Sequence, residues 1–308
     1  MTKLRLAIVG FGKIATTRHV PAIAATSGVE LVAVADPKVK SPGVPNFASL
    51  DALLRDGPEI DAVTLCTPPQ VRTVQARLAL EARKHVMLEK PPGATVSEIA
   101  PLLAVAQAAR KTLFATWHSR FAPAVEPARE LLAKRSIKSV TIIWKEDVRV
   151  WHPGQDWIFA AGGFGVFDPG INALSILTRI LPRPVFVTGA ELGFPSNHEA
   201  PIVVEMDMAD ATGLPIRAEF DFRHSGPQTW DIRVETDRGP LVLSGGGAKM
   251  SDGDEGVVDA MKEEYPALYR RFVDLAAKGE CDVDLAPLQI VADAFLLGRR
   301  RDVEAFGF

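Results

Sequence analysis

The six residues Gly10-Phe11-Gly12-Lys13-Ile14-Ala15 decide the fold of the first third of this chain. They follow an apolar run over residues 4–9 and match the pattern G-x-G-x-x-G/A. In that pattern a side chain at the first glycine would obstruct a tight turn, one at the second would keep the backbone from a pyrophosphate, and a small third residue lets the helix pack closely. The segment therefore predicts a strand, a turn and a helix whose N-terminus binds a dinucleotide. The expected contacts are Gly10, Gly12, Lys13 and Ile14.

Short apolar runs alternate with longer amphipathic stretches through the first 120 residues. The runs cover residues 4–9, 30–35, 62–66, 85–88 and 112–116. Runs of this kind are typical of strands buried on both faces, and at this spacing they indicate right-handed crossovers and a parallel sheet. Thr95 and Glu98 stand in capping-box spacing before an expected helix over residues 99–109. We therefore expect residues 1–120 to form an NAD(P)-binding Rossmann domain.

The pattern changes after about residue 121, where apolar and polar residues alternate over residues 216–223 and 230–235. This alternation indicates strands with one buried face. Further strands are expected at residues 140–144, 185–190 and 202–208, and helices at residues 264–278 and 287–300. The predicted fold class is α/β, with the Rossmann domain followed by an α+β domain over residues 121–308 on a largely antiparallel open sheet. We expect this second domain to bind substrate and to pair two subunits into a homodimer.

Polar residues at two strand ends extend the expected cofactor site. Asp36 ends the second strand, where an acidic side chain accepts hydrogen bonds from the adenosine ribose. Its charge repels a 2′-phosphate and favours NAD, while Lys38 weakens that preference and leaves NADP possible. A ligand crossing the carboxyl ends of the strands would also meet Thr67 and Pro68, although prolines there are explained equally well as turn residues.

The composition gives no reason to expect a nucleic acid, a membrane or a metal as partner. Charged residues make up 24% of the 308 residues and the formal net charge is -3, so no field attracts polyanions. No apolar run approaches the roughly 18–20 residues that a membrane span requires, and residues 4–9 are too short for a signal peptide. Cys66 and Cys281 lie far apart, and no Cys, His and Asp set has metal-ligand spacing. We expect a cytoplasmic protein whose partner is a small neutral molecule.

The fourth expected strand runs into Glu89-Lys90-Pro91. With a glycine loop before it and a sheet domain after it, this segment resembles the E-K-P motif of the glucose-fructose oxidoreductase / inositol dehydrogenase (Gfo/Idh/MocA) family, and the resemblance spans nearly the whole chain. It implies that Lys90 reaches the reacting hydroxyl beside the nicotinamide, that Glu89 and Lys90 contact the cofactor, and that the Lys90-Pro91 bond is cis. Without the resemblance, Lys90 would be interpreted as a solvated lysine.

Members of this family carry a second motif, D-x-G-x-H-x-x-D, whose histidine accepts the proton. This chain has Asp168-Pro169-Gly170-Ile171-Asn172-Ala173-Leu174-Ser175 in its place. Because asparagine cannot accept a proton at working pH, the general-base role passes to Asp168, while Asn172 can hydrogen-bond a substrate hydroxyl. An aspartate directly before a proline is also typical of a helix N-cap, and the sequence favours neither reading of Asp168.

This variant of the motif, with Trp144-Lys145-Glu146-Asp147 and Trp151-His152-Pro153-Gly154-Gln155, resembles the sugar 1-dehydrogenases of the family that act on galactose and arabinose. The resemblance implies oxidation of the anomeric carbon of D-galactose to a lactone, with L-arabinose and D-fucose as further substrates. Sugars present hydroxyls around an apolar C–H face, so their pockets need polar acceptors and an aromatic wall. The residues implied to line the sugar site are His118, Glu146, Trp151, His152 and Trp230.

Two other functions stay open. One is a different sugar or polyol dehydrogenase, with Lys90 as the principal acid/base. The other is a cofactor- or sugar-sensing regulator, because the family includes galactose-pathway repressors that lack turnover. The presence of both Lys90 and Asp168 argues against a regulator. The remaining histidines, such as His19 and His224, are interpreted as structural.

Overall fold

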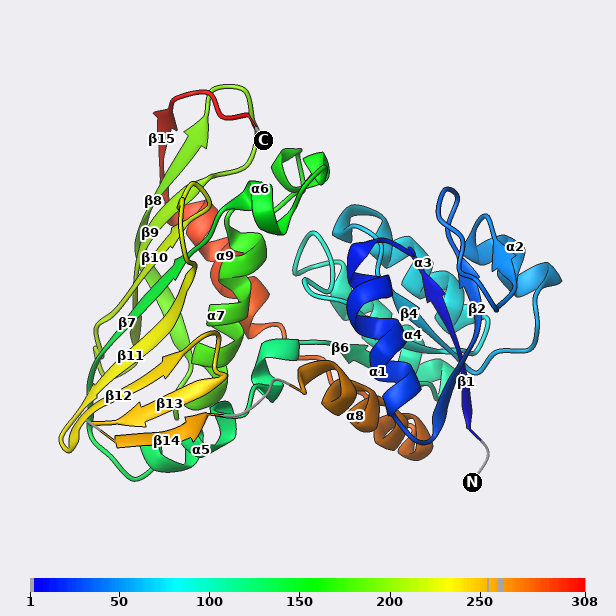
Figure 1. Ribbon diagram of the computed structural model, residues 1–308, viewed down its shortest axis with the longest axis horizontal. Helices are drawn as coiled ribbons and strands as arrows, with labels where there is room; N and C mark the ends of the chain where they lie inside the picture. The colour runs from blue at the N-terminus through cyan, green and yellow to red at the C-terminus, as the bar shows by residue number, and fades with distance from the viewer. Residues whose placement is uncertain (1–2, 254, 260–262, 308) are drawn as a thin grey trace. The chain divides into compact units, whose positions relative to one another are not determined.

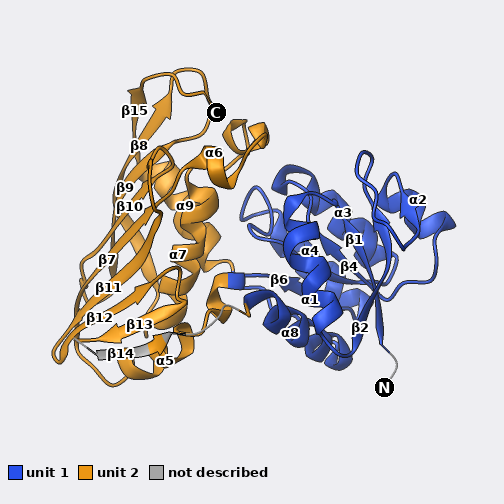
Figure 2. Cartoon of the chain, viewed as in Figure 1, with its two compact units in different colours: residues 1–118, 264–284 blue, residues 119–263, 285–308 orange. Residues whose placement is uncertain are grey.

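The computed structural model describes residues 3–253, 255–259 and 263–307, and the chain divides into two compact units (Figure 2). Unit 1 comprises residues 1–118 and 264–284, and unit 2 comprises residues 119–263 and 285–308. This division differs from a single boundary at residue 120 because α8 (Glu264–Lys278) returns to unit 1. Phe272 of α8 is fully buried and stacks on Phe114, with 6.3 Å between ring centroids, so this distant segment completes the core of the first unit.

Unit 1 is built on a six-stranded sheet in which every neighbouring pair of strands is parallel (Figure 1). In spatial order its strands are β3 (Asn46–Phe47), β2 (Val29–Ala35), β1 (Leu4–Val9), β4 (Ala62–Leu65), β5 (His85–Leu88) and β6 (Leu113–Ala115). Every residue of β4 and β5 is buried, which explains their nearly unbroken apolar sequence. The predicted Rossmann-type fold is confirmed.

The helices of unit 1 follow from this strand order. They are η1 (Ala15–His19, π-helical), α1 (Val20–Ala25), α2 (Leu50–Asp56), α3 (Pro69–Glu81), α4 (Ile99–Ala109) and α8. The order reverses between β1 and β4, so right-handed crossovers place α1 and the α3–α4 pair on opposite faces. Helix α4 spans the predicted residues, and the Glu98 carboxylate accepts the Thr95 backbone N–H (2.8 Å), although the Thr95 side chain forms no cap.

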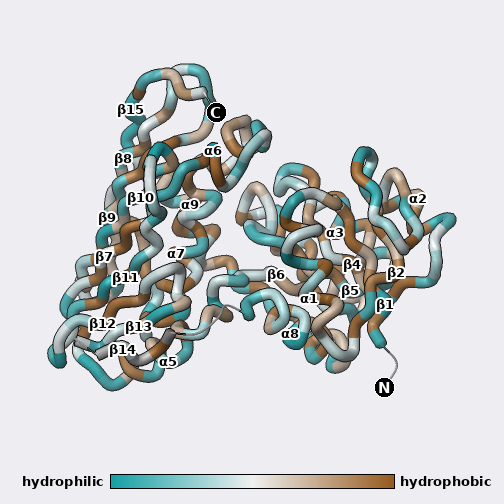
Figure 3. Tube along the Cα trace, viewed as in Figure 1, coloured by the Kyte–Doolittle hydropathy of each residue, from teal (hydrophilic) through white to brown (hydrophobic). Residues whose placement is uncertain are grey.

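Unit 2 is built on a nine-stranded open sheet that is mostly antiparallel, as predicted; only the β7–β10 and β8–β15 pairs are parallel among the described strands. In spatial order the strands are β14 (Glu255–Asp259), β13 (Lys249–Asp252), β12 (Gly239–Ser244), β11 (Thr229–Thr236), β7 (Ile137–Lys145), β10 (Ile216–Asp221), β9 (Val203–Asp210), β8 (Val185–Pro195) and β15 (Arg299–Val303). Figure 3 shows hydrophobic residues recurring along the strands of both units.

Helices cover one face of the unit 2 sheet. Helices α7 (Phe167–Ile180) and α9 (Ala286–Leu297) contact each other and the strands (Figure 1). The shorter helical segments are η2 (His118–Phe121), α5 (Val125–Leu132), α6 (Val148–Trp151) and η3 (Asp156–Phe159). The predicted helix over residues 287–300 is too long at its end: Gly298 is extended, and Arg299–Arg301 pair with β8 as the start of β15.

Candidate active site

The glycine loop has the geometry that a dinucleotide requires. Gly10 follows β1 with φ of +84°, and a Cβ built on it would lie 2.8 Å from the backbone nitrogen of Thr67, so any side chain there would clash. A Cβ on Gly12 would have no atom within 4 Å, which leaves the backbone open to a ligand. Ala15 is fully buried at the start of η1. The loop therefore fits a pyrophosphate beside the helix N-terminus.

Asp36 lies at the end of β2 and bonds to the glycine loop itself. Its Oδ2 accepts the backbone N–H of Phe11 (2.7 Å), and its Oδ1 accepts the backbone N–H groups of Lys38 and Val39 (2.8 Å each). Burial would raise the pKa of this carboxyl, but the three backbone donors outweigh it and hold the pKa below its usual value. Asp36 is therefore an anion fixed against the loop, and its bond to the ribose stays a prediction.

The segment after β4 is organised by a residue that sequence reasoning missed. The Thr67 hydroxyl donates to Gln75 Oε1 (2.6 Å), and Pro68 directly precedes α3, so the turn interpretation accounts for the proline. Arg72 on α3 is buried, and its guanidinium donates to the backbone carbonyls of Thr67, Glu89 and Pro91. One cation thus joins the loops after β4 and β5, a role that no local pattern around Arg72 could indicate.

Lys90 and its neighbours follow β5. The Lys90–Pro91 peptide bond is cis, as the family resemblance implied. The Glu89 side chain is buried, and its carboxylate accepts hydrogen bonds from within unit 1, including the backbone N–H of Lys90 (2.5 Å). His118 also belongs to unit 1, where its Nδ1 lies 2.6 Å from Glu264 Oε2 on α8. Contacts of Glu89 and Lys90 with the cofactor, and of His118 with sugar, stay predictions.

Unit 2 brings three of the predicted site residues, two of them buried carboxylates, into one cluster. Glu146 follows β7, His152 follows α6 and Asp168 lies in the first turn of α7. His152 Nε2 lies 3.5 Å from Glu146 Oε1 and 3.8 Å from Asp168 Oδ2. Both carboxylate residues are 3% exposed, so the cluster has little competition from water. We name Glu146, His152 and Asp168 the unit 2 cluster.

An aromatic wall adjoins the unit 2 cluster. Trp230 on β11 donates its indole N–H to Glu146 Oε2 (2.8 Å). It stacks on Trp144, its register partner on β7 (5.8 Å between centroids), and contacts Trp151 of α6 at 5.0 Å. Trp144 was not expected to take part, and its place opposite Trp230 follows from the strand register alone. The wall and the carboxylates together match the two kinds of surface that a sugar presents.

The N-cap interpretation of Asp168 is wrong. Helix α7 begins one residue earlier, at Phe167, and its N-cap Val166 makes no side-chain cap bond. The Asp168 carboxylate instead lies near His152. Asn172 is half-buried one turn further along, so both side chains share a helix face. A Cβ on Gly170 would lie 2.8 Å from the Phe220 ring, which explains the glycine of this motif as a point of close helix–sheet packing.

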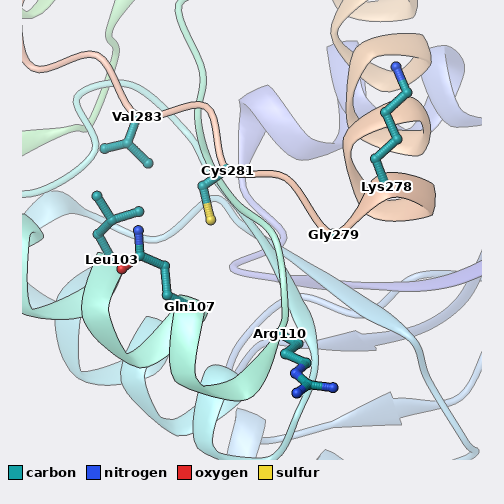
Figure 4. A pocket seen from close by; sticks show the side chains of 7 residues that line it. All are labelled: Leu103, Gln107, Arg110, Lys278, Gly279, Cys281 and Val283. Carbon is teal, nitrogen blue, oxygen red and sulfur yellow. The ribbon is translucent and has the colours of Figure 1, made fainter.

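A cavity in the described part of unit 1 lies outside the predicted site. This cavity, of about 610 Å³, is lined by Leu103, Gln107, Arg110, Lys278, Gly279, Cys281 and Val283, none of which was predicted to bind ligand (Figure 4). Among the described residues no His, Cys, Asp and Glu group has a metal-binding arrangement. Over that same part of the chain, every helix is too short or too polar to span a bilayer.

A glycine loop for a dinucleotide in one unit and a buried carboxylate–histidine cluster with a tryptophan wall in the other define a nicotinamide-dependent oxidoreductase of a polar small molecule. Comparisons with known proteins agree. The sequence model described as "Oxidoreductase family, NAD-binding Rossmann fold" (GFO_IDH_MocA) matches residues 4–116. Galactose 1-dehydrogenase of Pseudomonas fluorescens is 48% identical over 99% of both chains. The crystal structure of D-galactose-1-dehydrogenase protein from Rhizobium etli is 56% identical with a TM-score of 0.95, covering 100% of this chain and 99% of that one.

The chain belongs to the Gfo/Idh/MocA oxidoreductase family, as predicted. A more distant structure, KijD10, a 3-ketoreductase from Actinomadura kijaniata in complex with NADP, shares the fold with a TM-score of 0.86 at 20% identity, covering 98% of this chain and 100% of that one. The oxidoreductase class and the nicotinamide cofactor are thereby confirmed. The roles of the individual site residues stay predictions.

Proposed function

We propose that this protein is a D-galactose 1-dehydrogenase, which oxidises the anomeric carbon of the pyranose to a lactone with hydride transfer to NAD(P). The observation that carries the proposal is the unit 2 cluster beside its tryptophan wall. It occurs in a chain that is 48% and 56% identical, over essentially its full length, to two proteins named as galactose 1-dehydrogenases.

Oxidation of an anomeric hydroxyl removes its proton and the hydride of the same carbon. The nicotinamide supplies the hydride acceptor when it is bound, and unit 1 would hold the dinucleotide through Gly10, Gly12, Lys13, Ile14 and Asp36. Asp168 takes the hydroxyl proton, a step for which base catalysis is worth about 10²–10⁴-fold. The Lys90 ammonium stabilises the developing oxyanion and orients the hydroxyl.

The other site residues hold the sugar. The Glu146 carboxylate, fixed by the indole of Trp230, and the imidazole of His152 bind hydroxyl groups, and Asn172 adds an amide one turn from Asp168. Trp151 and Trp230 contact the apolar C–H face. His118 contributes a further hydrogen bond from unit 1. Roles of this kind make unit 2 the substrate-binding unit and unit 1 the cofactor-binding unit.

The finer assignments follow from the same residues. L-Arabinose and D-fucose share the configuration of D-galactose at the carbons nearest the reaction, so both are proposed as further substrates. The Asp36 anion favours NAD over NADP. One face of the unit 2 sheet carries exposed residues of mixed polarity, such as Phe186 and Arg217, and we propose that two subunits pair across it. Two free cysteines suit a reducing compartment such as the cytoplasm.

A panel of aldoses with each cofactor tests the proposal. Absorbance of the reduced nicotinamide gives kcat/KM for D-galactose, L-arabinose, D-fucose and D-glucose with NAD and with NADP. We expect D-galactose with NAD to give the largest value, and D-glucose, which differs at carbon four, to react poorly. Turnover of none of these sugars with either cofactor would contradict the proposal and favour a sensing regulator, which a binding isotherm without turnover would then identify.

The assignment of the base needs a separate measurement. Asp168→Asn keeps the size of the side chain but removes its proton acceptor, so the acidic limb of the kcat/KM pH profile disappears if Asp168 is the base. If the limb persists with its midpoint unchanged, Lys90 is the principal acid/base. Full turnover in both Asp168→Asn and Lys90→Met would overturn the mechanism as a whole.

A further inference from the structure

A buried group of polar side chains surrounds Glu89 inside unit 1. It consists of His19, Glu89, Tyr265 and Tyr269, whose exposed fractions are 0%, 3%, 6% and 0%. We name these four residues the Glu89 network. Two of them come from α8, which joins unit 1 from far along the sequence, and His19 ends η1 directly after the glycine loop. The proposed reaction assigns no role to His19, Tyr265 or Tyr269, whereas Glu89 is a predicted cofactor contact and the neighbour of Lys90.

The Glu89 carboxylate is held by three donors. Its Oε1 accepts the Tyr265 hydroxyl (2.7 Å) and lies 3.2 Å from His19 Nε2. Its Oε2 accepts the backbone N–H of Lys90 (2.5 Å). The buried Glu89 carboxylate therefore anchors the backbone N–H of Lys90. Both oxygens are engaged, so the carboxylate has little freedom to rotate.

The orientation of His19 is fixed as well. Its Nδ1 lies 2.8 Å from the Tyr269 hydroxyl, and its ring packs edge-on against Tyr265 and Tyr269 with centroids 4.9 and 5.8 Å away. Burial alone would lower the pKa of His19, but Cys66, Tyr269 and Glu89 outweigh it and hold the pKa well above its usual value. A doubly protonated imidazole donates from both nitrogens, one to Tyr269 and one to Glu89.

Arg72 also restrains the backbone around Lys90. Its guanidinium donates to the carbonyls of Glu89 and Pro91, the residues that flank Lys90. The backbone of Lys90 is thus bonded through its own N–H and through both neighbouring carbonyls.

A buried ion pair adds little net stability compared with apolar side chains of the same size, so stability alone is a weak reason for such a network. A reacting group displaced by about 1 Å can lose about 10²-fold in rate. We infer that Tyr265 and His19 are positioning residues of the reaction, which act through Glu89 to fix Lys90 against the reacting hydroxyl. The inference rests on the proposed function, because it takes Lys90 to act on the sugar.

Tyr265→Phe is the sharpest test, because it keeps the ring contacts of Tyr265 with His19 and His118 and removes one donor to Glu89. We expect kcat at saturating D-galactose and NAD to fall about tenfold, with KM for the sugar and Kd for NAD changed less than about twofold. Glu89→Gln keeps one of the two acceptor oxygens and the size of the side chain, so its kcat should exceed that of Glu89→Ala by about fivefold. Because a smaller fraction of folded enzyme would also lower the apparent kcat without changing KM, kcat is calculated per folded enzyme, with the folded fraction taken from urea unfolding of each variant.

Thr26→Val is the matched control, because it removes a buried hydroxyl bond to the Ala22 carbonyl in the same unit, away from Glu89. Its kcat should stay within about twofold of the parent. Unchanged kcat in Tyr265→Phe, or equal kcat in Glu89→Gln and Glu89→Ala, overturns the inference. Lys90→Met distinguishes failure of the positioning inference from failure of the proposed mechanism. If Lys90→Met loses turnover and Tyr265→Phe does not, only the positioning inference is wrong. If Lys90→Met keeps turnover, the proposed mechanism is wrong.

Discussion

Each unit buries a carboxylate beside a histidine, and the two pairs differ in how fully their hydrogen-bonding groups are used. Glu89 in unit 1 lies 3.2 Å from His19 and accepts two further short hydrogen bonds. Glu146 in unit 2 lies 3.5 Å from His152 and accepts one indole N–H. His152 Nδ1 is moreover one of the buried atoms of the described residues without a partner.

We interpret this difference as one between residues that position a reacting group and residues that bind the substrate. Buried polar groups are expensive unless they are hydrogen-bonded, so a cluster whose groups are already paired serves mainly to hold its own members in place. On the proposed function, the unit 2 cluster gains a hydrogen bond at His152 Nδ1 when a polyhydroxylated molecule enters. The Glu89 network is of the first kind, and the unit 2 cluster is of the second.

The largest expected effect is that of Asp168→Ala. We expect kcat to fall about 10²–10⁴-fold, because the proton acceptor is removed. The loss of a proton acceptor alone should leave the free energy of unfolding within about 1 kcal/mol of the parent. Initial rates at saturating sugar and urea unfolding measure the two quantities. Thr178→Val, on the same helix, is the control. A large loss of stability in Asp168→Ala would show that Asp168 has a structural role like that of the Glu89 network.

The next effect is on stability and compares the two histidines. His19→Leu leaves the Glu89 charge buried without its cation, so the free energy of unfolding should fall by about 3–5 kcal/mol. His152→Leu should cost less than about 1 kcal/mol, because its contacts are longer and its Nδ1 is already without a partner. Urea unfolding of both variants at one pH checks the difference. Equal losses of unfolding free energy would contradict the proposed difference between the Glu89 network and the unit 2 cluster.

A smaller effect is expected for Glu146→Gln. The amide oxygen can still accept the Trp230 indole N–H, but the charge that strengthens a sugar hydrogen bond is lost. We expect KM for D-galactose to rise about tenfold while kcat changes less than about threefold. Steady-state kinetics with the sugar varied at saturating NAD measure both constants. A fall in kcat alone would show that Glu146 acts on the reaction rather than on binding.

The last expected effect is a pH dependence of stability confined to the Glu89 network. The pKa of Glu89 lies below its usual value, because burial is outweighed by His19, so its stabilisation is present above about pH 4.3 and is lost as pH falls through the folded value. The pKa of His19 lies well above its usual value, so its stabilisation is complete below about pH 6.5 and is lost as pH rises through the folded value.

The two shifts place the greatest stabilisation between about pH 4.3 and 6.5. The difference in unfolding free energy between the parent and Glu89→Gln should be largest in that window and decline by up to about 1.4 kcal/mol per pH unit above it. Urea unfolding at intervals from pH 5 to 9 measures the curve. A flat curve would mean that His19 is neutral in the folded protein.

The sequence allowed the first sheet to be predicted almost residue by residue, because buried parallel strands are written as apolar runs and the glycine loop has a fixed local geometry. Lys90, Asp168 and Asn172 were predicted as site residues through motif resemblance, which depends on order along the chain. Trp144, Arg72 and Tyr265 were missed, because each acts on partners that strand register or a returning helix brings to it.

The sequence by itself determined the Rossmann-type unit, the antiparallel sheet and the family, since these depend on periodicity and on local motifs. Only the tertiary structure decided that α8 belongs to unit 1, that Asp168 approaches His152 instead of capping its helix, and that His19 supports the E-K-P segment. Contacts between residues far apart in the chain decide these points. Periodicity and local motifs describe only residues that are close in sequence, so they cannot predict such contacts.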